Sequence, residues 1–267
     1  MYMTYFGMKK NPFKKDIDLK DTYEFNDFKE VQGRLSYLLN TKGIGIITGT
    51  SGKGKTYSIR YFTEHLNKNL YKVAYLQLST LTVMDFYKGL CKELGIEPSN
   101  KKIDMFKQIQ DRIRNLAVDR KIIPVIVCDE AQYLRTDILN DLKMLLNFNM
   151  DSKDYAVLIL VGQPILNSIL EKSVHEALKQ RIMINYNFIG LDYDEVKNYI
   201  LNRCEIAGIS NAIFDDSAIK ALANGCNGST RVLNNLIDKC LFACCKKNEN
   251  IITSETVMYA ENDINLI

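Results

Sequence analysis

The sequence predicts an α/β fold built on a parallel sheet, followed by a smaller part that is entirely helical. Three observations support this prediction. Between residues 43 and 189, short apolar runs alternate with segments whose apolar residues have helical spacing. Some of these runs, such as residues 124–128 and 156–161, are apolar at every position, as in parallel strands that helices cover on both faces. After residue 190, only helical spacing follows.

Composition and charge are those of a globular protein. The 267 residues are 46% apolar and 25% charged, which excludes a disordered or fibrous chain. The chain has 35 Lys and Arg and 32 Asp and Glu, so its charges nearly balance. Any contact with nucleic acid therefore has to be made by a local basic patch. The 7 Cys form no CxxC pair and there are 2 His, so we expect reduced thiols and no zinc site. The absence of a secretory signal or of an apolar run of bilayer length predicts a cytoplasmic protein without membrane contact.

Residues 1–40 are predicted to form an extended arm followed by a helix. In the arm, aromatic residues alternate with lysines, while Gly7 and Pro12 disfavour a helix. These residues are Tyr2, Tyr5, Phe6, Phe13, Lys9, Lys10, Lys14 and Lys15. Such interleaving is compatible with nucleic-acid binding, but we favour rings that pack on the core while the lysines stay solvated. Residues 28–39 have helical spacing.

Residues 41–190 are predicted to form the α/β core and residues 191–267 a helical lid. The expected strands are residues 44–48, 72–78, 124–128, 156–161 and 183–189. The expected core helices are residues 55–67, 82–94, 103–116, 138–148 and 165–178. The expected lid helices are residues 192–207, 216–223, 229–246 and 254–261. Asp192 and Ser229 are at positions typical of helix N-caps, and Gly208 and Gly225 at positions typical of helix ends.

The eight residues after the first predicted strand match the phosphate-loop pattern GxxxxGK[ST]. They are Gly49, Thr50, Ser51, Gly52, Lys53, Gly54, Lys55 and Thr56. Glycines let backbone N–H groups converge on phosphates, and the helix that follows adds its positive N-terminal end. We expect Lys55 to reach the β- and γ-phosphates of ATP and the Thr56 hydroxyl to bind Mg²⁺.

Two carboxylates follow the buried strand at residues 124–128. Asp129 and Glu130 are expected at the carboxyl edge of the sheet, next to the phosphate loop. There Asp129 would hold the water shell of Mg²⁺, and Glu130 would polarise the attacking water. This pair predicts an ATPase, because a kinase needs a separate acceptor-hydroxyl site that the sequence does not reveal.

Three further side chains are candidates for the reaction. Gln163, at the tip of the strand beside Asp129, is expected either to orient the lytic water or to belong to a simple turn. Arg181 precedes the last strand and would act on the γ-phosphate of a neighbouring subunit in a ring or filament. Arg231 opens a lid helix and would contact the phosphates within its own chain. For both arginines, a surface ion pair is the alternative.

These residues together resemble the AAA+ ATPases of the ExeA type and their transposition-helper relatives, which are TnsC-like, MuB-like and IstB-like. The resemblance lies in the phosphate loop and in Tyr5-Phe6-Gly7, Asn11-Pro12-Phe13, Asp129-Glu130-Ala131-Gln132, Gly162-Gln163-Pro164, Gln180-Arg181-Ile182 and Gly228-Ser229-Thr230-Arg231. One departure is Thr230, where members of the family usually carry proline. The resemblance implies an AAA+ core with strand order 5-1-4-3-2, a helical lid, and ATP bound at a subunit boundary. It also places Tyr23 or Phe25 near the adenine.

The resemblance implies two alternative functions. Because the chain ends at Ile267 directly after the lid, we expect the transposition-helper branch, whose members assemble on duplex DNA without sequence preference and direct a transposase. The candidate DNA contacts are Lys101, Lys102, Lys107, Arg112 and Arg114, with a solvated helix face as the slightly favoured alternative. The alternative function is that of an ExeA-like secretion or envelope-assembly ATPase, which acts on protein partners without nucleic acid. A nucleotide-binding switch without hydrolysis is disfavoured because both Asp129 and Glu130 are present.

Overall fold

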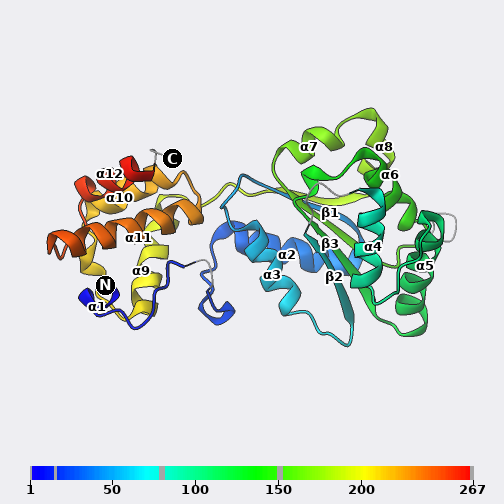
Figure 1. Cartoon of the computed structure of the whole chain (residues 1–267), viewed down its shortest axis with the longest axis horizontal. Helices are drawn as coiled ribbons and strands as arrows, with labels where there is room; N and C mark the ends of the chain where they lie inside the picture. The colour runs from blue at the N-terminus through cyan, green and yellow to red at the C-terminus, as the bar shows by residue number, and fades with distance from the viewer. Residues whose placement is uncertain (1, 15–16, 78–81, 149–152, 265–267) are drawn as a thin grey trace. The chain divides into compact units, whose positions relative to one another are not determined.

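Five parallel strands form one sheet in this computed structural model, which describes residues 2–14, 17–77, 82–148 and 153–264. The strands are β1 (Gly43–Thr48), β2 (Tyr71–Gln77), β3 (Ile123–Asp129), β4 (Val157–Gly162) and β5 (Ile182–Asn187). Their order, β2-β3-β4-β1-β5, confirms the expected topology (Figure 1). Lys15 of the predicted arm and Leu78 at the end of the second predicted strand lie outside the described residues.

Helices cover both faces of this sheet, which explains why the central strands β3 and β4 are buried along nearly their whole length. They are α2 (Asn26–Thr41), α3 (Lys55–Glu64), α4 (Val83–Glu93), α5 (Lys102–Arg114), α6 (Thr136–Leu145), α7 (Ile165–Leu170) and α8 (Glu176–Lys179). Figure 1 shows α2 and α3 on one side of the sheet and α4, α5 and α6 on the other. On the second side, Leu76, Phe86 and Ile109 belong to one buried apolar cluster. On the first side, α2 approaches so closely that a Cβ at Gly45 would lie 2.6 Å from Leu38 Cδ2.

The described residues divide into two units, here called the α/β unit and the helical unit. The α/β unit consists of Glu30–Thr50 and Lys55–Phe188. The helical unit consists of the described parts of Met1–Lys29, Ser51–Gly54 and Ile189–Ile267. Its helices are α1 (Tyr2–Tyr5), α9 (Tyr193–Ala207), α10 (Asp216–Cys226), α11 (Thr230–Lys247) and α12 (Ser254–Ile264). Among the described residues of both units, none of the helices combines the length and the apolar character needed to cross a bilayer.

The caps of the helical unit follow the sequence signals with one exception. Asp192 and Ser229 accept hydrogen bonds from backbone N–H groups in the first turns of α9 and α11, as predicted. Gly208 ends α9 in the left-handed conformation, also as predicted. The helix end predicted at Gly225 is wrong, because α10 continues to Cys226 and Asn227 takes the left-handed conformation. Asparagine tolerates this conformation through its short polar side chain.

The N-terminal arm belongs to the helical unit, where its first helix contacts α11. Residues Tyr2–Tyr5 form one helical turn, so the prediction of an extended arm is wrong there. The Tyr2 hydroxyl donates to Asp238 of α11, and Phe13 is buried. These contacts favour the packing interpretation of the aromatic residues over nucleic-acid binding.

Candidate nucleotide-binding site

The two ends of the phosphate loop belong to the α/β unit. Gly49 follows β1, and Lys55 begins α3. The Lys55 ammonium is buried and donates to the carbonyl oxygens of Gly49 at 2.6 Å and Thr50 at 2.8 Å. A Cβ at Gly49 would lie 2.7 Å from the Cβ of Phe188, so this position requires glycine. The predicted phosphate-binding cation therefore lies within the loop at the N-terminus of α3.

The middle of the loop, Ser51–Gly54, belongs to the helical unit, where it contacts the start of α11. The Thr230 hydroxyl donates to the carbonyl oxygen of Gly52 at 2.7 Å, and the Arg231 guanidinium donates to the Ser51 hydroxyl at 3.1 Å. Gly52 has a φ of 84°, and a Cβ there would lie 2.3 Å from Ser229 Oγ. Arg231 therefore contacts the loop through Ser51, and its expected contact with the phosphates stays a prediction. The departure at Thr230 supplies a hydroxyl donor that proline lacks.

Of the two aromatic residues considered for adenine, only Phe25 lies at the loop. A Cβ at Gly54, which has a φ of 93°, would lie 3.1 Å from the Phe25 ring. Tyr23 instead packs edge-on against Tyr199 of α9, with ring centroids 5.6 Å apart.

Asp129 and Thr56 meet at the carboxyl edge of the sheet, as the loop and strand motifs predicted. The Thr56 hydroxyl donates to Asp129 Oδ2 at 3.0 Å, although the two residues are 73 positions apart. The Asp129 side chain is also bonded by Tyr75, whose hydroxyl donates to the same Oδ2 at 2.7 Å. The backbone N–H of Glu130 donates to Oδ1 at 2.9 Å. Asp129 itself is only 3% exposed.

Glu130 is connected to the turn after β4 through Gln132. Its backbone lies in the left-handed region, with φ 56° and ψ 38°. The Gln132 amide donates from Nε2 to Glu130 Oε2 at 2.7 Å and accepts at Oε1 from the backbone N–H of Gln163 at 3.0 Å. A Cβ at Gly162 would lie 2.6 Å from Gln132 Oε1, so the bridge needs a glycine at that position. Gln163 is therefore linked to Glu130 through the Gln132 side chain, and Gln163 takes part in this link through its backbone N–H.

Arg181 lies at the amino ends of the parallel strands, whereas the phosphate loop lies at their carboxyl ends. Its carbonyl oxygen accepts from the N–H of Ile44, at the beginning of β1, whereas the phosphate loop follows the end of β1. The four residue steps from Ile44 to Thr48 span roughly 13 Å at about 3.3 Å per residue. Burial lowers the pKa of Arg181, but a guanidinium stays charged at neutral pH. Arg181 is thus remote from the phosphate loop of its own chain.

The residues at the carboxyl edge fit Mg²⁺ in the presence of nucleotide. Among the described residues, no group of three or more His, Cys, Asp or Glu side chains could hold a metal ion. Thr56 and Asp129 supply one hydroxyl and one carboxylate, and Mg²⁺ commonly takes few protein ligands together with substrate phosphates and water. The neighbouring thiol of Cys128 is no alternative ligand, because burial and the charge of Asp129 raise its pKa to about 12.

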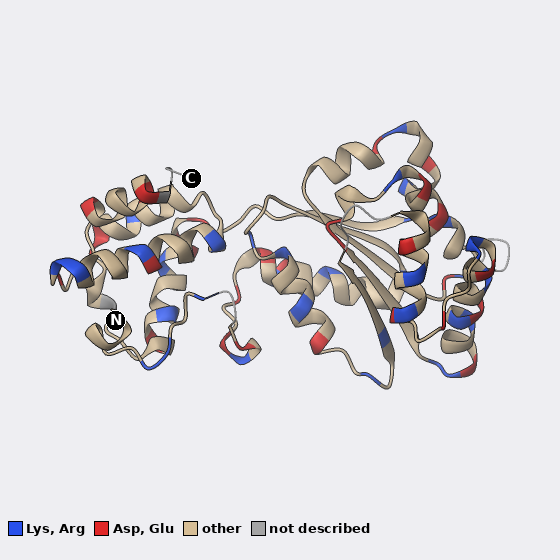
Figure 2. Cartoon of the chain, viewed as in Figure 1, with Lys and Arg blue, Asp and Glu red and all other residues tan. Residues whose placement is uncertain are grey.

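The basic residues proposed to contact DNA do not form a uniform basic face. Lys102 makes an ion pair with Asp141 at 2.6 Å, and Arg112 donates to the carbonyl oxygen of Leu94 at 3.1 Å. Lys101, Lys107 and Arg114 are exposed. Figure 2 shows acidic residues interspersed with the basic ones over the helices of this region.

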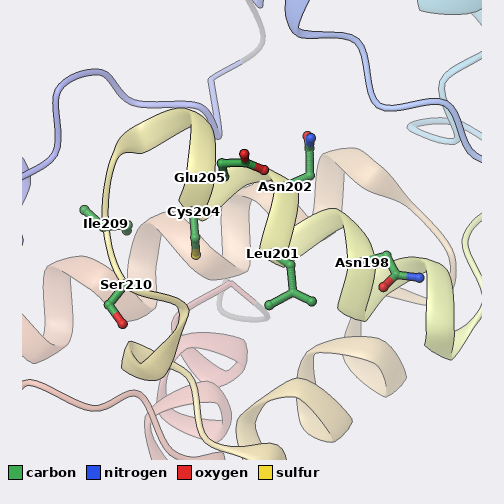
Figure 3. Close-up of a pocket in the computed structure, with 7 residues that line it drawn as sticks. All are labelled: Asn198, Leu201, Asn202, Cys204, Glu205, Ile209 and Ser210. Atoms are coloured by element: carbon green, nitrogen blue, oxygen red, sulfur yellow. The ribbon is translucent and has the colours of Figure 1, made fainter.

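A pocket in the helical unit lies along α9, with a volume of about 560 Å³ (Figure 3). It is lined by Asn198, Leu201, Asn202, Cys204, Glu205, Ile209 and Ser210. None of these is a predicted site residue.

Sequence reasoning missed the contribution of two residues. Gln132 was noted only as part of a family string, and Tyr75 was not among the candidate site residues. The signal for Gln132 was its position two residues after Glu130. No comparable local signal existed for Tyr75, because its hydroxyl meets Asp129 only through the pairing of β2 with β3.

Comparison with known proteins places this geometry in a known fold. The family model described as AAA domain matches residues 38–170. General secretion pathway protein A of Aeromonas hydrophila is 29% identical over 269 aligned positions, which cover 99% of this chain and 48% of that protein. The chain thus spans about half the length of this curated relative.

Two solved structures illustrate the similarity of the fold. Cdc6p from Pyrobaculum aerophilum superposes with a TM-score of 0.73 at 15% identity, covering 94% of this chain and 70% of that one. The Aeropyrum pernix ORC1 protein, solved in complex with DNA, gives a TM-score of 0.70 at 16% identity, covering 96% and 70%. Residues 38–170 therefore carry an AAA-type domain, and the chain has the AAA+ P-loop fold.

Proposed function

We propose that this chain binds ATP with Mg²⁺ and hydrolyses it. The observation that carries the proposal is the hydrogen bond between the Thr56 hydroxyl and the Asp129 carboxylate at the end of β3. A phosphate-loop threonine and a strand-end carboxylate at this distance are the two protein groups that hold Mg²⁺ in P-loop ATPases. The AAA-type domain match over residues 38–170 supports the same activity.

The proposed roles follow from the positions of the side chains. The loop amides and the Lys55 ammonium would bind the phosphates, with Arg231 acting from the start of α11. Mg²⁺, when bound, supplies charge neutralisation at the phosphates. Glu130 would orient and deprotonate the attacking water, and Gln163 would help to position it.

Arg181 would act on the nucleotide of a neighbouring subunit. Its place at the edge of the sheet opposite the loop supports this role over one in its own site. The proposed ATPase would therefore be complete only after self-association into a ring or filament.

We further propose that the ATPase acts on protein partners, in the manner of the ExeA type. Support comes from the similarity to general secretion pathway protein A, which extends over 99% of this chain. The transposition-helper function expected from the sequence, with a transposase as partner, has no support from the relatives described above. Two of the five basic residues on which DNA binding was expected to depend also make contacts within the α/β unit.

Duplex DNA binding is the second candidate. It is favoured by the exposed Lys101, Lys107 and Arg114, and by the fold shared with an ORC1 protein that was solved on DNA. Nonspecific binding of duplex DNA weakens steeply with salt, because phosphate contacts release counterions.

One set of measurements tests both parts of the proposal. Calorimetric titration of ATP with and without Mg²⁺, followed by a phosphate-release assay, should show binding and turnover. Absence of binding in both titrations would overturn the ATPase proposal. Fluorescence anisotropy with labelled duplex DNA, ATP and Mg²⁺ at about 50 and 200 mM salt separates the partner classes. Salt-sensitive binding would favour DNA, whereas its absence in a protein that hydrolyses ATP would favour protein partners.

A further inference from the structure

We propose that Tyr75 is a positioning residue that fixes the Asp129 carboxylate for Mg²⁺ binding. The inference rests on the proposed ATP site and assigns a function to a residue outside the phosphate loop and the Asp129-Glu130 pair.

The Asp129 carboxylate accepts from donors on three different segments. Tyr75 on β2 and Thr56 on α3 both donate to Oδ2, at 2.7 and 3.0 Å. The backbone N–H of Glu130 donates to Oδ1 at 2.9 Å. A carboxylate has about four acceptor positions, so most of them are defined by these bonds. Rotation of the carboxylate about its Cβ–Cγ bond would break at least one of them.

The sheet register explains why tyrosine can make this contact. Tyr75 pairs with Val127, and Gln77 pairs with Asp129. Tyr75 is therefore diagonal to Asp129 across two neighbouring parallel strands. Because such strands lie about 4.8 Å apart and rise about 3.3 Å per residue, the two backbones are roughly 8 Å apart, a separation that a long side chain can bridge. A phenol places its hydroxyl far enough along β3 to reach the carboxylate, whereas serine or threonine at this position would be too short. Phenylalanine would fill the same space without a donor.

Because an ordinary tyrosine has a pKa of about 10, the Tyr75 hydroxyl is protonated and can donate a hydrogen bond over the physiological pH range. The phenol supplies a hydrogen bond to Oδ2 of the buried carboxylate, and this bond offsets part of the free-energy cost of removing that oxygen from water. The Tyr75 bond can therefore hold the carboxylate orientation before and after nucleotide arrives.

The contact between Tyr75 and Asp129 should affect ATP binding in the presence of Mg²⁺ differently from ATP binding in its absence. ATP binding without Mg²⁺ depends on the loop and Lys55, neither of which contacts Tyr75 in the hydrogen bonds described. The gain in ATP affinity caused by Mg²⁺ depends on the orientation of Asp129. A positioning function should thus appear in this gain and leave the metal-free affinity unchanged.

The test is calorimetric titration of ATP into wild type, Tyr75→Phe and Tyr71→Phe, each in EDTA and in Mg²⁺. Tyr71 lies on the same strand four residues away, where β2 begins, and serves as the matched control. We expect Tyr75→Phe to reduce the Mg²⁺-dependent gain roughly tenfold, the order expected for one hydrogen bond to a charged group. Its metal-free affinity and the gain of Tyr71→Phe should stay within about twofold of wild type.

Two results would overturn the assignment. A Tyr75→Phe variant with the full Mg²⁺-dependent gain would show that the hydroxyl does not position Asp129. An equal loss of affinity in EDTA and in Mg²⁺ would show a general structural effect instead. Failure of wild type to bind ATP in either buffer would reject the proposed ATP site itself, so the two failures are distinguishable.

Discussion

The side-chain amide of Gln132 donates to Glu130 Oε2 at 2.7 Å and accepts from the backbone of Gln163 at 3.0 Å. Glu130 follows β3 and Gln163 follows β4, so one side chain joins the ends of two neighbouring strands. Because Glu130 has a left-handed backbone, its carboxylate direction is set by a conformation that non-glycine residues rarely adopt. Gln132 therefore holds the proposed catalytic carboxylate in a defined place.

Replacing Gln132 with alanine should slow hydrolysis more than it weakens binding. We expect the turnover rate of Gln132→Ala to fall about tenfold, which corresponds to roughly 1.4 kcal/mol of lost transition-state positioning. ATP affinity should remain within about twofold of wild type. Phosphate release and calorimetry measure the two quantities, with Gln110→Ala on α5 as the matched control. An unchanged turnover rate would show that Glu130 needs no support from Gln132.

Replacing Lys55 with alanine should abolish nucleotide binding. The ammonium is buried within the loop, and its loss removes the cation expected to face the β- and γ-phosphates. We expect ATP affinity to drop at least about 100-fold. Calorimetry on Lys55→Ala and on Lys68→Ala, an exposed lysine beyond α3, provides the comparison. Equal affinity in Lys55→Ala and wild type would reject the assignment of the phosphate loop.

Replacing Glu130 with glutamine should separate binding from turnover. The variant keeps the size of the side chain but loses the base that would activate water, so we expect hydrolysis to fall about 100-fold or more. ATP binding should persist, and any nucleotide-dependent assembly should become long-lived. Turnover assays and size-exclusion chromatography with ATP measure these effects. Undiminished hydrolysis would mean that another residue positions the water.

Replacing Arg181 with alanine should impair hydrolysis without affecting ATP affinity. Arg181 lies at the sheet edge opposite the loop, so we expect it to serve a neighbouring subunit. Turnover should fall about 100-fold or more. Mixing Arg181→Ala with Lys55→Ala should restore part of the activity, because a mixed assembly contains sites with an intact loop and an intact arginine. A mixture as inactive as its components would contradict action between subunits.

Protonation of His175 should destabilise the α/β unit in mild acid. His175 is 1% exposed, and neither ring nitrogen has a hydrogen-bond partner among the described residues. Burial lowers its pKa, and the charge of Lys172 lowers it further. Below the unfolded-state pKa of about 6.5, the unfolded chain binds a proton that the folded chain resists. The free energy of unfolding should therefore fall as pH drops from 7 to 5, by up to about 1.4 kcal/mol per pH unit.

The comparison of His175→Phe with His65→Gln tests this pH effect. Denaturant unfolding at pH 7, 6 and 5 should show a smaller pH dependence in His175→Phe than in wild type. His65 is exposed and stacks on Tyr61 with ring centroids 4.0 Å apart, so His65→Gln should retain the wild-type slope. The same slope in all three proteins would assign the pH dependence to other groups.

Much of the site could be predicted because its residues occupy fixed positions relative to local elements. The phosphate loop joins a strand to a helix, and Asp129 ends an apolar run, so both could be assigned to the carboxyl edge before any contact was known. Gly225 was misassigned because a glycine near a helix end predicts termination, whereas α10 continues through Gly225 to Cys226 and Asn227 is its left-handed cap. A glycine reports conformational freedom without saying whether the fold uses it.

The sequence by itself determined the alternation of strands and helices, the loop chemistry and the acid pair, since each is carried by residues close together in the chain. Only the tertiary structure decided that Tyr75 bonds to Asp129 and that Arg181 lies away from the loop of its own chain. These relationships depend on which strands are neighbours and in what register they pair. Register is set by the packing of both sheet faces at once, and local spacing does not contain that information.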